Sequence, residues 1–284
     1  MSLLETADTA QLIRLLDLFP AANLSRDWPD YTGKKVEVCK AVARSESAKS
    51  IARFVDRNFD SCRQHVHVFS HDGKLKDAPP VLLQGQRIRH QSGVSSLYLI
   101  DACYTLILED PIETVDLHFL WPVRVELESS NHCLVRFVIL EKDLGSYATR
   151  SYIGTKGATD ESSILKHMVN LHQKHEFRGV DLHKGIKALW DENLIDAIRI
   201  KFKKHKSTTT EDMDEEAGLK ATYPDVYENI KTRPIRSGLF KTLGTTFSVP
   251  TFSSKPSDYM LTFPRYTEKL GGTTDVVRQV LRRN

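Results

Sequence analysis

The spacing of the hydrophobic residues changes at His65, and this change limits the possible fold more than any other feature of the chain. Upstream, apolar residues recur every three or four positions, as in "TADTAQLIRLLDLF" at 6–19. Downstream, the period is two, as in "HVHVFSHDG" at 65–73, where valines alternate with histidines. The first period is typical of amphipathic helices and the second of half-buried strands. The sequence therefore predicts a helical N-terminal bundle followed by an antiparallel sheet.

Three short helices are expected before His65. The first covers 6–19, with Thr6 or Asp8 as its N-cap, and Pro20 ends it. The second covers 31–45, and the third starts after a cap at Ser45 or Ser47. The residues expected to face the interior from the second and third helices are Val36, Cys39, Val42, Ala43, Ile51, Phe54, Val55, Asn58, Phe59 and Cys62.

After His65, the sequence pattern predicts a series of strands and then a series of helices. Strands are expected up to residue 144, and "SSNH" at 129–132 suits a hairpin turn. Helices are expected from Thr159 and from Asp181, and a last amphipathic helix ends the sequence with "TTDVVRQVLRRN". A sheet followed by helices that cover one of its faces indicates an α+β fold.

Charge marks a boundary near residue 206. Five positive charges lie between 199 and 206, and five negative charges lie between 211 and 216. A charge-dense segment with few apolar residues buries too little surface to order itself, so a linker is predicted there. The predicted domains are a helical bundle (1–64), an antiparallel sheet with helices (65–206), an acidic linker (207–222) and a small basic C-terminal module (223–284).

Composition narrows the class of protein. Hydrophobic residues at 40% and charged residues at 27% are ordinary for a soluble globular chain. The net charge is +3, but residues 231–284 hold ten Lys or Arg against three acidic residues, so the basic character is local. No apolar run approaches the roughly 18 residues of a membrane span, and the N-terminus does not resemble a secretory leader. Four scattered cysteines without a C-x-x-C motif predict reduced thiols. We expect an intracellular protein, nuclear or cytoplasmic, without membrane contact.

No motif encodes a known catalytic site. His65, His67 and His71 on one strand, or His172 with His175, are possible metal ligands, but neither group has a Cys or acidic companion at ligand spacing. Surface or core histidines are the simpler interpretation. The chain holds no Walker loop, G-x-S-x-G or G-x-G-x-x-G motif. No cofactor is expected, and a non-enzymatic role is favoured.

Two functional alternatives remain open. The first is a metal-dependent nuclease of a microbial defence or mobile-element system, with Glu126, Glu128 and Glu141 as its acids. The second is a protein adaptor whose exposed strand edge recruits another subunit without nucleic-acid contact.

Basic residues carry the favoured hypothesis. Lys34 and Lys35 stand where a helix begins, and such junctions offer lysines and N–H groups to phosphates. In "IRIKFKK", alternation turns Arg199, Lys201 and Lys203 to one side of a strand, at a cost in repulsion that a polyanion relieves. The acidic run after this strand either folds onto the basic residues or keeps a linker soluble.

Two segments resemble the CENP-N family of inner-kinetochore proteins. Residues 11–69, from "QLIRLLDLF" to "QHVHVF", are similar to the helical N-terminal module of that family, and residues 164–190, "ILKHMVNLHQKHEFRGVDLHKGIKALW", are similar to its helix–strand–helix element. The resemblance covers about a third of the chain. It implies a non-enzymatic protein whose helical module and sheet grip a nucleosome and its DNA, and whose C-terminal sheet pairs with a related subunit.

Together these features predict a nucleic-acid binding and assembly protein, with DNA the favoured nucleic acid and a protein partner expected at the C-terminal module. The candidate contacts with nucleic acid are Arg14, Lys34, Lys35, Lys40, Arg199, Lys201, Lys203 and Lys204.

Overall fold

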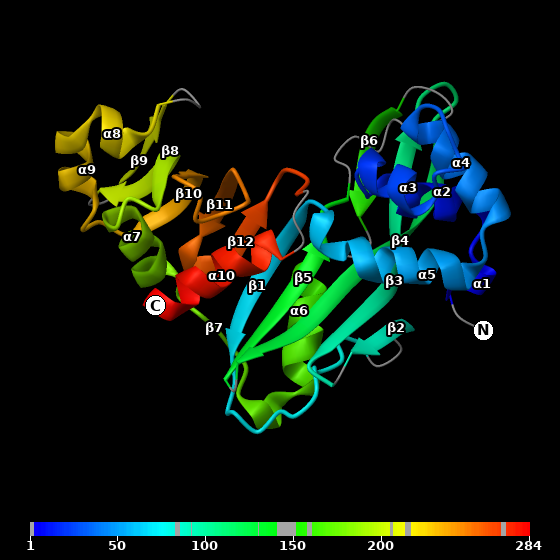
Figure 1. Cartoon of the computed structure of the whole chain (residues 1–284), viewed down its shortest axis with the longest axis horizontal. Coiled ribbons are helices and arrows are strands. Elements are labelled where there is room, and N and C mark those ends of the chain that lie inside the picture. The colour runs from blue at the N-terminus through cyan, green and yellow to red at the C-terminus, as the bar shows by residue number, and fades with distance from the viewer. Residues whose placement is uncertain are drawn as a thin grey trace. The chain divides into compact units, whose positions relative to one another are not determined.

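The protein has an α+β fold made of two compact units, as a computed structural model shows (Figure 1). The structure describes residues 3–82, 86–91, 93–129, 131–140, 152–157, 161–204, 207–213, 217–267 and 271–284. One unit comprises Met1–Cys62 and His71–Phe177, and the other comprises Arg63–Ser70 and Arg178–Asn284. The α+β class is as predicted. The unit boundaries differ from the predicted domains because the strand at 64–70 pairs with strands near the C-terminus.

The first unit begins with a helical bundle that has two more helices than the sequence predicts. The bundle consists of α1 (Leu3–Thr6), α2 (Thr9–Asp17), α3 (Ala21–Asp27), α4 (Lys35–Ser45) and α5 (Ala48–Asn58). Asp8 caps α2 in a capping box with Gln11, and the Ser47 side chain caps α5. Pro20 ends the first predicted helix and stands before α3 as its N-cap.

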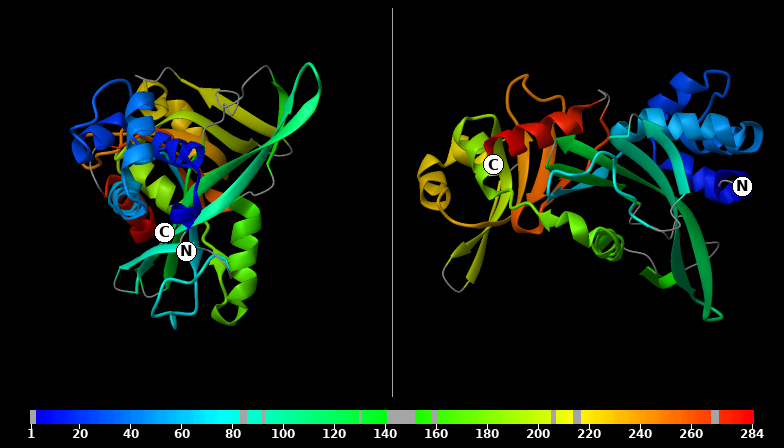
Figure 2. Two further views of the ribbon diagram at one scale, coloured as in Figure 1. Left: turned by 90° about the vertical axis from the view of Figure 1, so that its right-hand side faces the viewer. Right: turned by 90° about the horizontal axis from the view of Figure 1, so that it is seen from below.

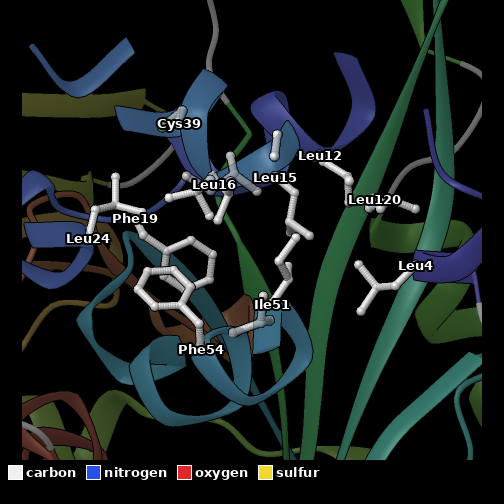
Figure 3. Close-up of a cluster of buried hydrophobic side chains, with 14 of the residues drawn as sticks. Leu4, Leu12, Leu15, Leu16, Phe19, Leu24, Cys39, Ile51, Phe54 and Leu120 are labelled. Carbon is white, nitrogen blue, oxygen red and sulfur yellow. The ribbon is translucent and has the colours of Figure 1, made fainter. Parts of the chain in front are cut away.

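An apolar cluster holds the bundle together (Figure 3). Within this cluster, the ring of Phe54 lies 4.9 Å from that of Phe19 and 4.5 Å from that of Trp28 between centroids. Leu120 of the sheet belongs to the same cluster, so the helices and the sheet share one core. The predicted inward face of α5 is confirmed. On α4, Val36 is 48% exposed, contrary to prediction, and Val38 is buried in its place.

The sheet of the first unit is antiparallel throughout its described strands. Its order is β2 (Gln86–Gln91), β3 (Ser95–Leu108), β4 (Glu113–Ser129) and β5 (His132–Val138), and β6 (Tyr152–Gly157) also pairs with β3. Ser129 pairs with His132, as the predicted hairpin requires. Helix α5 and helix α6 (Glu161–Leu171) lie on opposite faces of this sheet (Figures 1 and 2).

The second unit holds a further antiparallel run of strands. Its order is β1 (Gln64–Ser70), β12 (Met260–Phe263), β11 (Thr251–Lys255), β10 (Ile235–Thr242), β8 (Ile195–Lys204) and β9 (Ser207–Asp212), and β7 (Arg178–Gly179) also pairs with β1. Its helices are α7 (His183–Asp191), α8 (Leu219–Thr222), α9 (Pro224–Ile230) and α10 (Gly272–Arg283). Helices α7 and α10 pack closely because Gly185 has no side chain: a Cβ there would lie 2.2 Å from the Val280 carbonyl oxygen.

The segment predicted as an acidic linker contains regular structure. Residues 207–212 form β9, which pairs with the basic strand β8, and α8 follows at Leu219. The β-branched residues Thr208, Thr209 and Thr210 favour a strand. Low hydrophobicity here reflects an exposed strand at the edge of a sheet, where few apolar residues are needed.

A buried carboxylate joins β8 to the helices that follow it. Asp196 is 2% exposed, and its carboxylate accepts hydrogen bonds from Trp190 Nε1 at 2.9 Å and from the backbone N–H groups of Ala197 (2.8 Å), Lys220 (2.9 Å) and Ala221 (3.1 Å). A Cβ at Gly218 would lie 2.0 Å from this carboxylate. Asp196 therefore fixes the start of α8 against the basic strand.

No helix among the described residues is long and apolar enough to cross a membrane. All four cysteines are free, and burial raises the pKa of Cys39 to about 12.

Replacing Asp196 with Ala is expected to lower the free energy of unfolding by about 2–4 kcal/mol, because several buried donors lose their acceptor. Urea denaturation of the full chain measures this change. Asp225→Ala, an exposed acid in the first turn of α9, serves as the control and should cost less than about 1 kcal/mol. Equal losses for both variants would show that the Asp196 hydrogen bonds contribute little.

Candidate nucleic-acid interface

The basic strand β8 presents its cations on one open face. Arg199, Lys201 and Lys203 are exposed, while Ile198, Ile200 and Phe202 between them are at most 4% exposed. The predicted alternation is confirmed. Lys204 ends β8, and its side chain lies outside the described part of the chain.

Strand β9 determines which of these cations are neutralised. Arg199 faces Asp212, and its Nη2 lies 2.7 Å from the Asp212 carboxylate, an interaction that raises the pKa of Arg199. Lys201 is opposite Thr210, and Lys203 is opposite Thr208. Neither lysine makes an ion pair within the described residues. Two lysines thus keep their charge available beside two exposed hydroxyl groups.

Three of the four candidate cations of the helical bundle are engaged by other residues of the first unit. The Arg14 guanidinium donates two hydrogen bonds to the His118 carbonyl oxygen at 2.8 and 3.1 Å and lies 5.2 Å from the centre of the Phe119 ring. Lys35 Nζ is 2.9 Å from an Asp17 carboxylate oxygen, and Lys40 Nζ is 3.1 Å from that of Glu37. Lys34 is exposed and forms no ion pair with any described residue. Of these four residues, Lys34 is the one most available to a phosphate.

Glu126, an acid of the nuclease alternative, belongs to a buried charge network. Its carboxylate lies 2.8 Å from Nε of Arg136, whose side chain is fully buried, and 4.0 Å from Nη1 of Arg124. Arg124 also contacts the carboxylates of Asp56 and Asp60, each at 3.4 Å. We call these five residues the Arg124 network. A carboxylate held by two guanidinium groups is a poor ligand for a divalent cation.

No described residues complete a metal centre. Glu141 lies outside the described residues, and among the described residues no group of three or more His, Cys, Asp or Glu side chains could hold a metal ion. Two of the histidines considered as ligands have other partners: His172 Nε2 is 3.1 Å from the Pro80 carbonyl oxygen, and His175 Nδ1 is 3.2 Å from the Asp72 carboxylate.

Sequence reasoning missed a row of cations on α5. Lys49, Arg53 and Arg57 are exposed and line one cleft of about 750 Å³ between α5 and the sheet, with Arg124 also in its wall. Their spacing of four residues was visible in "AKSIARFVDRN", where they lie beside the apolar residues that the period of the helix turns inward. Lys49 and Arg53 form no ion pair within the described residues, whereas Arg57 lies 3.4 Å from Asp27.

Comparison with protein-family models, with curated proteins and with solved structures finds no match for this chain.

Replacing Glu126 with Ala is expected to lower the free energy of unfolding by about 3–5 kcal/mol, because a fully buried guanidinium loses its carboxylate. Thermal and urea denaturation measure the loss, and Glu109→Ala, an exposed acid, should stay within about 0.5 kcal/mol of wild type. The nuclease alternative makes the opposite prediction: a stable Glu126→Ala variant that no longer degrades labelled DNA in Mg²⁺ or Mn²⁺.

We expect the first unit to lose stability in mild acid, because three of its histidines have lowered pKa values. Burial lowers the pKa of His71, His132 and His172 from the ordinary value of 6.5, and His71 Nδ1 accepts a hydrogen bond from Gly73 N–H, which requires an unprotonated nitrogen. Of the groups near His71, Asp72 opposes the shift in its pKa, and His132 and His175 add to it.

Because the folded state binds fewer protons than the unfolded state, stability is complete above about pH 6.5 and falls as the pH drops below that value. Urea denaturation at pH 7.5, 6.0 and 5.0 measures the loss, and His71→Gln should reduce it. A pH dependence identical in wild type and variant would contradict this assignment.

Proposed function

We propose that the protein is a non-enzymatic nucleic-acid binding protein that contacts phosphates through the open face of the β8–β9 hairpin. The observation that carries this proposal is the arrangement of Lys201 and Lys203. Both are exposed on the same side of β8 without an ion pair among the described residues, and each lies opposite a threonine of β9.

Repulsion between the lysines supports a polyanionic partner. Residues two apart on a strand lie about 7 Å from each other, so the two ammonium groups repel one another and gain when a phosphate backbone lies across them. Thr208 and Thr210 add hydroxyl groups, which commonly donate hydrogen bonds to phosphate oxygens. Such contacts position a nucleic acid without reading its sequence.

Among the described residues of the hairpin, the number of unpaired cations sets the expected salt dependence of binding. With Arg199 held by Asp212, two phosphate contacts give a slope of log affinity against log salt near −1.8. Lys34 of the first unit is a further candidate contact. The resemblance to the CENP-N family favours DNA over RNA, and a related subunit at the C-terminal module remains a prediction from that resemblance.

The double variant Lys201→Ala/Lys203→Ala is expected to bind a labelled 30-bp DNA duplex more weakly and to lose about 1.8 units of salt slope. Fluorescence anisotropy at 50, 100 and 200 mM NaCl measures both quantities. The matched control is Lys166→Ala/Lys184→Ala, two exposed lysines on α6 and α7. Equal binding by wild type and the β8 variant at 50 mM would remove the proposed function.

A variant that frees an additional cation should increase the affinity for DNA, which tests the same surface by a gain of binding. Asp212→Asn releases Arg199 from its ion pair, so the variant should bind the duplex more tightly and add about 0.9 units of salt slope. A decrease in affinity would show that Arg199 does not face the phosphates.

A further inference from the structure

The cleft between α5 and the sheet of the first unit has a cationic end. It encloses about 750 Å³, and four guanidinium or ammonium groups line it against two carboxylates. Both carboxylates, those of Asp56 and Asp60, lie against Arg124 in the cleft wall. Lys49 and Arg53 have no such partner among the described residues, so the accessible charge of the cleft is positive.

The other end of the cleft is mainly apolar. A second cavity of about 280 Å³ adjoins the first and shares Lys49, Ala52 and Ile88 with it. Its remainder is lined by Leu3, Leu4, Ala48 and Leu99 together with the charged residues Glu5 and Arg87. A cavity of this size accepts a single large apolar side chain. Lys49 therefore stands at the junction between an apolar cavity and a row of cations.

The row of cations has the spacing of an extended peptide. In an α-helix, residues four apart are separated by about 6 Å along the axis, so Lys49, Arg53 and Arg57 span about 12 Å. In an extended chain, alternate residues on one side are about 7 Å apart. Acidic residues at alternate positions of a peptide would therefore meet successive cations of α5.

We propose that this cleft binds a short acidic peptide segment of a partner protein, with one apolar anchor side chain. The anchor fills the cavity beside Leu3, Leu4 and Leu99, and the carboxylates that follow it pair with Lys49, Arg53 and Arg57. Arg124 supports this site from the wall, where its Nε–H is buried and has no acceptor among the described residues. A mainly apolar cavity at one end fits a peptide with an apolar anchor better than a nucleic acid, whose phosphates carry charge at every step.

The test uses the full chain and a fluorescein-labelled dodecapeptide that contains one Phe followed by Asp at three alternate positions, separated by Ser. Anisotropy at 50 mM NaCl should show saturable binding. The charge reversal Lys49→Glu/Arg53→Glu should weaken it at least tenfold, and Lys166→Glu, an exposed lysine on α6, should leave it unchanged. Replacing Phe with Ser in the peptide should also weaken binding at least tenfold. Circular dichroism confirms that each variant is folded.

Several results would overturn this proposal. Equal affinity for a peptide with Asn in place of Asp would exclude charge recognition, and equal affinity after Phe→Ser would exclude the anchor cavity. Failure of the peptide to bind, with loss of duplex DNA binding in Lys49→Glu/Arg53→Glu, would make the cleft a nucleic-acid surface instead. The result is independent of the β8–β9 hairpin, because Lys201→Ala/Lys203→Ala should not change the affinity for the peptide.

Discussion

The first unit depends on the contacts that the Arg124 guanidinium makes between the helices and the sheet. This guanidinium lies at the junction of two layers, where it donates a hydrogen bond of 2.6 Å to the Asp56 carbonyl oxygen, contacts two carboxylates from the helical side and stacks 4.5 Å from the Phe59 ring. Arg136 lies directly opposite Arg124 on the neighbouring strand, and Glu126 separates their charges. Like charges facing each other across a sheet are destabilising unless an acid intervenes. The network therefore fixes α5 in one position, and the row of cations on α5 keeps a defined alignment with the cleft.

In the second unit, strand pairing determines which basic side chains are neutralised. Strand β9 brings one acid and two exposed threonines to the open face of β8, so a single register decides that Arg199 is neutralised while Lys201 and Lys203 are not. Asp196, on the same strand but buried, holds the start of α8 against β8. A shift of one residue in this pairing would move every cation to the other face. The availability of charge here is thus a property of register and not of composition.

Local periodicity was enough to predict much of this structure. The alternation of β8, the inward face of α5 and the hairpin at Ser129–His132 all follow from residues near each other in sequence. The partners of the charged residues cannot be predicted from neighbouring positions in this way. Arg14 meets the carbonyl oxygen of His118, 104 positions away, and no rule of spacing links them. The charged segment after residue 206 predicted a linker because low hydrophobicity is shared by linkers and by exposed edge strands. The pairing of β1 with β12 is equally invisible to local patterns.

The net charge of +3 describes this protein poorly, because burial decides which charges a ligand meets. At physiological salt, the Debye length is about 8 Å, and exposed charges are screened beyond that distance while buried pairs are screened much less. The Arg124 network has side chains that are 22% exposed or less, so salt leaves it largely intact. The exposed lysines of β8 and the exposed cations of α5 respond to salt in full. Raising the ionic strength should therefore separate the two roles of the basic residues, since it releases anionic ligands while the folded scaffold that presents the cations persists.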